Sequence, residues 1–81
     1  MHLIILTPGK KIFEGSVQKV TLPGSAGLFQ LLENHAPLVS LLQQGTIFYE
    51  SEQQASELVI EEGFVEVENN NVVILVKSLS N

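Results

Sequence analysis

The chain has 81 residues, with four lysines, nine glutamates and no arginine, aspartate or cysteine, so its net charge is −5 at neutral pH. This length fits one small domain, which we expect to span residues 1–81. Four cations cannot neutralise a row of phosphates, which argues against nucleic-acid binding and against a polybasic contact with an anionic membrane. Without cysteine there is no disulfide framework, thiolate nucleophile or cysteine-ligated metal site. With 44% hydrophobic and only 16% charged residues, the composition indicates a folded domain with some surface covered by something else.

The first predicted strand, Leu3–Leu6, is apolar at consecutive positions and ends at the turn signal Thr7-Pro8-Gly9. A strand of a two-layer domain buries one face and shows the other to water. An uninterrupted apolar run indicates either that both faces are covered, by a loop or by another protein, or that some apolar residues are simply exposed. We favour a covering protein, because the last predicted strand, Val72–Val76, has the same pattern.

Three further segments alternate in polarity, as strands with one buried face do: Val17–Leu22, Ile47–Glu50 and Val65–Glu68. Turn residues separate the strands at positions 14–16, 22–24, 51–54, 62–63 and 69–71. The asparagine triplet at 69–71 predicts a tight hairpin, because asparagine tolerates a positive φ angle. Short strands at this spacing predict an all-β domain, either a small antiparallel two-sheet sandwich or a flattened barrel.

The segment from residue 28 to residue 42 fits two patterns. Its leucines also fall at helical spacing. Pro37 opposes a helix, because proline in a helix interior loses a hydrogen bond and clashes one turn back, at a cost of about 3 kcal/mol. Ala36, before this proline, is pushed toward extended geometry. We therefore predict strand, loop, strand, with Glu33 and Asn34 in the loop.

Few residues could carry catalysis or bind a metal. Residues 24–27 lack both the spacing of a nucleophile elbow and the lysine of a P-loop, and they are typical of a glycine-flanked turn. Ser25, His35 and a glutamate could be combined into a catalytic triad, but such a combination arises by chance more often than it marks a site. A small hydrolase is therefore a minor alternative. His2 and His35 lack ligand spacing. We expect no catalytic residue, cofactor, metal or small-molecule substrate, and we expect a backbone carbonyl to fix the His35 imidazole.

Phe64 is a candidate contact residue. If Val65 and Val67 point inward, Phe64 lies on the outer face beside two glutamates. The aromatic ring then either folds over a bulge at Gly63 or anchors an interface.

The order of residues along the chain is more specific than any short motif. The informative runs are TPGKKIFEG at 7–15, VTLPGSAG at 20–27, HAPL at 35–38 and GFVEV at 63–67. This ordered set, over essentially the whole chain, strongly resembles the amino-terminal domain of the epsilon subunit of F-type ATP synthases.

The resemblance implies a flattened two-sheet β-sandwich at the foot of a rotating central stalk. It implies a noncatalytic subunit that packs on the gamma subunit and rests on the ring of c subunits. Proton flow turns the ring, and the stalk conveys torque to catalytic sites elsewhere. The location implied is peripheral, on the cytoplasmic side of the membrane and without insertion, which agrees with the absence of any targeting or spanning segment in the sequence.

The resemblance also assigns contact residues by position. The gamma-facing residues it implies are Thr7, His35, Ala36 and Ser40. The ring-facing loop it implies runs from Ala26 to Glu33 and includes Gly27 and Leu28. Many relatives have an acidic residue where Leu28 stands, so a ring contact at this position would be apolar.

Two points stay open on the sequence alone. Members of the family commonly continue into a helical hairpin that inhibits ATP hydrolysis and in some cases binds ATP. This sequence stops at Asn81, as a natural short form or a truncated one, and neither property is assigned to it. The competing class is a generic β-sandwich adaptor or homodimer whose apolar face meets a copy of itself.

Overall fold

The structure is a computed structural model, and it describes residues 1–79. The last two residues of the expected domain, 80 and 81, lie outside the described residues. Nine strands and no helix make up the described part of the chain. The strands are β1 (His2–Thr7), β2 (Lys10–Ser16), β3 (Lys19–Gly24), β4 (Gly27–Leu32), β5 (Leu38–Leu42), β6 (Gly45–Glu50), β7 (Ala55–Ile60), β8 (Gly63–Glu68) and β9 (Asn71–Val76).

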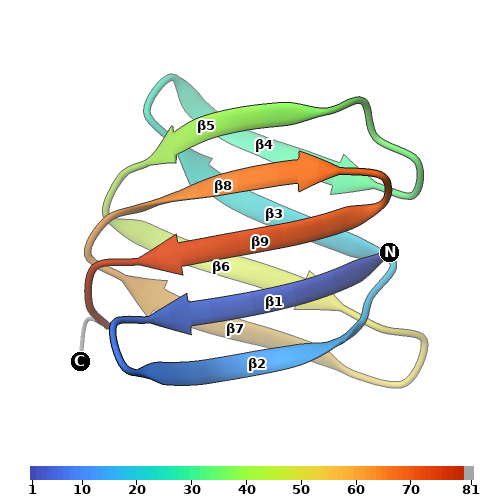
Figure 1. Cartoon of the computed structure of the whole chain (residues 1–81), viewed down its shortest axis with the longest axis horizontal. Helices are drawn as coiled ribbons and strands as arrows, with labels where there is room; N and C mark the ends of the chain where they lie inside the picture. The colour runs from blue at the N-terminus through green and yellow to red at the C-terminus, as the bar shows by residue number, and fades with distance from the viewer. Residues whose placement is uncertain (80–81) are drawn as a thin grey trace.

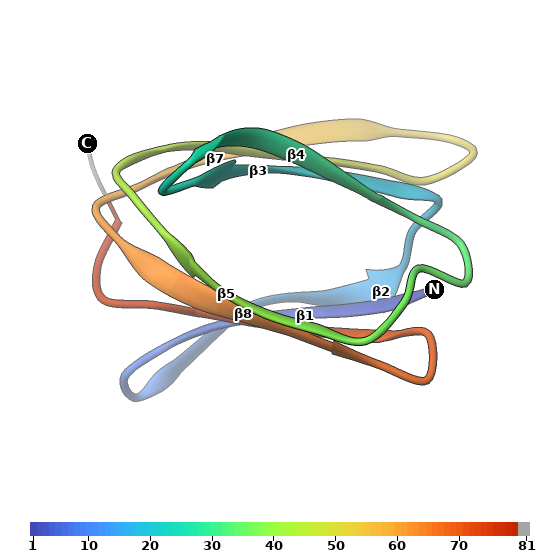
Figure 2. The same cartoon turned by 90° about the horizontal axis from the view of Figure 1, so that it is seen from above.

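The strands lie in two layers (Figures 1 and 2). The first sheet has the order β5-β8-β9-β1-β2, and the second sheet has the order β4-β3-β6-β7. A single pair, Gly24 with Leu42, joins β3 to β5, so the ladder continues from one layer into the other. The predicted all-β two-sheet sandwich is therefore confirmed. One pairing differs from the antiparallel expectation, because β1 and β9 run parallel.

The connections gather at two ends of the sandwich (Figure 1). The Met1 end holds the amino terminus, the β4–β5 loop at 33–37 and the β8–β9 turn at 69–70. The Gly63 end holds the β1–β2 turn at 8–9, the β3–β4 turn at 25–26 and the β7–β8 link at 61–62. Each surface residue described below is placed relative to these two ends.

The core lies between the sheets and is built from alternate residues of each strand. In β9 the inward residues Val72, Ile74 and Val76 are buried, and in β8 so are Val65 and Val67. No polar or charged side chain is buried in residues 1–79. The buried residues of the hydrophobic core are Met1, Leu3, Ile5, Val17, Val20, Leu22, Leu31, Leu42, Ile47, Ile60, Val65, Val67, Val72, Ile74 and Val76.

The segment 28–42 is strand, loop, strand, as predicted, with β4 and β5 on either side of residues 33–37. Its leucines are divided between core and solvent. Leu31 and Leu42 are buried, whereas Leu28 is 73% exposed and Leu32 is 51% exposed. Alternation along a strand places Leu28 and Leu31 on opposite faces, whereas on a helix residues three apart would share one face.

Glycines and asparagines have different roles in the turns. Asn69 and Asn70 have φ angles of 51° and 63°, which gives the two-residue hairpin that the triplet predicted. Predicted turns at 14–16 and 22–24 were wrong, since both segments lie inside strands. Gly24 is needed for close packing, because a Cβ there would lie 2.7 Å from the Phe29 ring. The bulge at Gly63, one of the two alternatives for Phe64, is absent from the β8–β9 ladder. A register shift lies instead between Ile5 and Leu6, in the β1–β2 ladder.

Candidate protein-interaction surfaces

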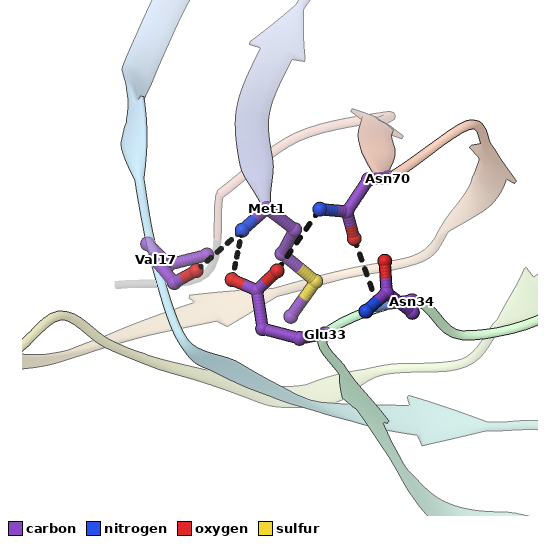
Figure 3. Close-up of polar contacts among 5 residues, drawn as sticks. All are labelled: Met1, Val17, Glu33, Asn34 and Asn70. Atoms are coloured by element: carbon purple, nitrogen blue, oxygen red, sulfur yellow. Dashed lines mark hydrogen bonds and ion pairs between the residues drawn. The ribbon is translucent and has the colours of Figure 1, made fainter.

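At the Met1 end, Glu33 joins the β4–β5 loop to two other segments (Figure 3). The Met1 ammonium donates hydrogen bonds to the Val17 carbonyl oxygen, at 3.0 Å, and to the Glu33 carboxylate. The Asn70 side-chain amide donates to the other Glu33 oxygen at 2.9 Å and accepts the Asn34 backbone N–H at 2.9 Å. The bond from the Met1 ammonium, followed by that from Asn70, holds the pKa of Glu33 below its usual value. We call this network the Glu33 clasp.

The four residues assigned to a gamma-facing surface do not form one patch. Thr7 lies at the Gly63 end, whereas His35 and Ala36 lie in the β4–β5 loop at the Met1 end. Ser40 lies in the middle of β5, paired with the inward-pointing Val65. The His35 ring Nδ1 lies 2.9 Å from the Ala36 carbonyl oxygen, which confirms the expectation of an imidazole fixed by backbone.

The residues assigned to a ring-facing loop are also divided. The segment from Ala26 to Glu33 is mostly strand β4 and not a loop, because residues 27–32 pair with β3. Ala26, Gly27 and the exposed Leu28 lie at the Gly63 end, while Glu33 lies at the opposite end in the clasp. Exposed Leu28 can make apolar contacts, but the Glu33 carboxylate is engaged within the chain.

The residues proposed for hydrolysis are not brought together. Ser25 lies before β4 and His35 lies after it, so about six strand residues, or roughly 20 Å, separate them. A nucleophile and base must lie within hydrogen-bond reach, which removes the hydrolase alternative. Among residues 1–79, no three His or Glu side chains gather as metal ligands, and no helix is long and apolar enough to cross a membrane.

A row of apolar residues crosses the outer face of the first sheet at the Gly63 end. Cross-strand pairing places Leu41 beside Phe64, Phe64 beside Leu75, and Leu75 beside Leu6. Leu41 is 69% exposed and Leu75 is 38% exposed. A groove of about 1000 Å³ opens over this row, and Thr7 also lines it. We call these four residues the outer row.

The outer row was only partly visible in the sequence. Phe64 was expected on this face, and the apolar runs in β1 and β9 indicated that the second face of each strand is apolar. Within residues 1–79 no third layer covers that face (Figure 2). Leu41 was missed, because its contribution depends on the pairing of β5 with β8, and single-strand periodicity says nothing about strand order.

Comparison with known proteins decides the family. Residues 1–81 match the family described as ATP synthase, Delta/Epsilon chain, beta-sandwich domain. The chain belongs to this family.

Curated relatives of the ATP synthase delta/epsilon family agree. The chain is 43% identical over 76 residues to the ATP synthase epsilon chain of Campylobacter concisus, and 36% identical over 75 residues to that of Leptospira borgpetersenii. These matches cover 93% of this chain but 59% of each relative, so the chain spans little more than half of their length. The ATP synthase epsilon chain of Chlorobium limicola, 39% identical over 79 residues, is covered to 90%.

Solved structures share the fold. A chain in the cryo-EM structure of Euglena gracilis mitochondrial ATP synthase, OSCP/F1/c-ring in rotational state 1, superposes with a TM-score of 0.90 at 23% identity, over 96% of this chain and 51% of that chain. A chain in the central stalk/c-ring structure of Tetrahymena thermophila mitochondrial ATP synthase gives a TM-score of 0.82 at 17% identity, over 99% and 65% of the two chains. At these identities the likeness establishes the β-sandwich fold of the family.

Proposed function

We propose that this chain is a noncatalytic subunit of the central stalk of an F-type ATP synthase, coupling proton-driven rotation of the c-ring through the gamma subunit to ATP synthesis. The observation that carries the proposal is the outer row, an apolar surface left uncovered on a member of the delta/epsilon family. Apolar area of this kind, rimmed by polar residues, marks a protein interface. The proposed location is therefore peripheral, on the cytoplasmic side of the coupling membrane, and held there through the complex.

The mechanism proposed is mechanical. The first sheet would pack on gamma through the outer row, and torque would pass through interfaces that do not slip. Such interfaces depend on well-packed apolar cores, and the sandwich offers a rigid support because every buried residue of its core is apolar. No titrating group has to change its charge for this role.

The contact residues follow the same proposal. On the gamma side we retain Thr7, His35, Ala36 and Ser40, of which Thr7 lines the groove beside the outer row. On the ring side we retain Ala26, Gly27, Leu28 and Glu33. Within this set Leu28 would carry the apolar contact, since 73% of its surface is exposed, and Glu33 would contribute mainly by holding the adjacent loop.

The direct test is to mix the protein with the gamma subunit of the same organism. We expect a stable one-to-one complex by size exclusion with light scattering, and no ATP binding by isothermal titration calorimetry. A tight self-dimer whose mass does not change when gamma is added would instead support the adaptor or homodimer alternative. Micromolar ATP binding to this chain would contradict the expectation of no ATP binding.

A further inference from the structure

The rim of the groove carries a charge opposite to that of the whole protein. The chain has four lysines and a net charge of −5, yet three of the lysines, Lys10, Lys11 and Lys77, line this one groove. Glu62 is the only carboxylate among the lining residues described. The lysines are therefore concentrated around the outer row, whereas glutamates outnumber lysines in the rest of the protein.

These lysines remain accessible. The Lys77 ammonium lies 3.3 Å from Glu62, and its side chain is still 73% exposed. Lys11 lies 2.7 Å from Glu14 and is also more than half exposed. Exposed ion pairs of this kind contribute little to stability. The lysine charges are thus available to a partner at little cost to the fold.

The other carboxylates of the outer face lie further toward the Met1 end. Glu66, paired with Val39 and Val73, and Glu14, paired with Ile4, lie one row beyond the outer row. Glu68 pairs with Asn71, a further row away. The face is therefore divided into a cationic rim at the Gly63 end and an anionic region toward the Met1 end. A partner with one charged end would be held in one orientation by this division.

We propose that the groove docks a protein segment whose apolar side chains are flanked by carboxylates, with those carboxylates lying over Lys10 and Lys77. The inference rests on the proposed function, because it takes the segment to belong to the gamma subunit. Four adjacent strands span about 14 Å, a length that about nine or ten residues of helix would cover. An open row of this length suits the side of such a segment better than it suits an enclosed small molecule.

The test compares two charge-reversed proteins. In the double variant Lys10→Glu/Lys77→Glu, gamma should bind at least about 10-fold more weakly, mainly through slower association, and the remaining binding should depend less on salt. The control for position is Lys19→Glu, which carries one charge reversal where the double variant carries two. Lys19 belongs to the second sheet and pairs with Glu50 at 3.2 Å, as Lys77 pairs with Glu62. The control should bind gamma within about twofold of the unchanged protein. Thermal unfolding of each variant shows that the fold is intact.

Four outcomes would count against the inference. Equal binding of gamma by the double variant, or equal weakening by Lys19→Glu, would overturn it and leave the proposed function standing. Saturable binding of oleate that the double variant loses, with gamma binding unchanged, would assign the groove to a small amphiphile. Failure of the unchanged protein to bind gamma at all would instead remove the proposed function, and this inference with it.

Discussion

At the Met1 end, polar side chains bond to one another across the amino terminus, the β4–β5 loop and the β8–β9 turn, through the Glu33 clasp. At the Gly63 end, the links approach each other through backbone groups. The Lys77 N–H donates to the Glu62 carbonyl at 2.8 Å, and the Gln43 N–H donates to the Pro23 carbonyl at 2.9 Å. Side chains at this second end, including the lysines and the outer row, are left facing outward.

This difference separates residues that hold the fold from residues that can hold a partner. A carboxylate that already accepts two hydrogen bonds within the chain, as Glu33 does, offers less to another protein. An exposed leucine in an open groove has no such role in the fold. We therefore expect substitutions of side chains in the Glu33 clasp to change stability, and substitutions of the exposed side chains of the groove to change binding.

The largest effect on stability is expected at Gly63, a groove residue whose role lies in the close approach of the β8 and β9 backbones. A Cβ at Gly63 would lie 2.2 Å from the Leu75 carbonyl oxygen, so β8 and β9 would have to move apart. Gly63→Ala should lower the free energy of unfolding by about 3 kcal/mol, at the upper end of overpacking effects. Urea unfolding followed by circular dichroism measures this change.

Gly9→Ala is the control for Gly63→Ala. Gly9 has a φ angle of +80° but nothing within 4 Å of an added Cβ, so its substitution costs only backbone strain, about 1–2 kcal/mol. Equal destabilisation by the two variants would show that packing between β8 and β9 is not what requires Gly63.

The next effect concerns binding. Leu41→Glu places a charge in the outer row and should weaken gamma binding by at least about 30-fold, or about 2 kcal/mol, as for a buried interface anchor. Because Leu41 is 69% exposed in the free protein, its stability should change by less than about 0.5 kcal/mol. Surface plasmon resonance and thermal unfolding measure the two quantities.

Val59→Glu tests whether any charge on an apolar surface has the same effect. Val59 lies on the second sheet, paired with Thr46, and is 41% exposed. This variant should bind gamma like the unchanged protein. Loss of binding in Val59→Glu, with binding retained in Leu41→Glu, would move the interface to the second sheet.

Local features of the fold were predictable because they depend on neighbouring residues. Asn69 and Asn70 specify the hairpin by their tolerance of positive φ, and Pro37 excludes the helix that the leucine spacing would otherwise allow. Glycines were misinterpreted where their role depends on the neighbouring strand. Gly24 was assigned to a turn and Gly63 to a turn or a bulge, but an added Cβ would meet the Phe29 ring of β4 at Gly24 and the Leu75 carbonyl oxygen of β9 at Gly63.

The surfaces were less predictable because they depend on strand order. A period of two shows which residues within β1 share a face and which within β9 do, but not that the two strands pair in parallel with Ile4 beside Val73. In the same way, no local pattern connects Met1 with Glu33 or Lys10 with Lys77. The Glu33 clasp and the rim of the groove arise only when segments more than 30 residues apart in sequence meet.

A smaller effect on stability is expected from Asn70 in the clasp. Asn70→Gly keeps the positive φ of the turn but removes the bonds to Glu33 and to the Asn34 N–H. Asn69→Gly is its control, because Asn69 has a similar φ of 51° and lies next to it in the same turn. Asn70→Gly should be slightly less stable than Asn69→Gly, because only the change at Asn70 removes these two exposed hydrogen bonds. Equal stabilities in urea unfolding would mean that the clasp is dispensable for the fold.

The smallest effect is on the titration of Glu33. Its pKa is lowered from 4.5 by the Met1 ammonium and then by Asn70, so ionised Glu33 stabilises the folded state above about pH 4.5. That stability is lost as the pH falls through the lowered pKa. In Asn70→Gly the pKa of Glu33 should rise toward 4.5, as followed by NMR of the side-chain carboxyl carbon. Glu14 is the internal reference, because Lys11 and then His2 lower its pKa, and neither residue belongs to the clasp. A shift of both carboxylates by the same amount would point to a change in the whole sandwich, whereas a shift of Glu33 alone would locate the effect at the Met1 end.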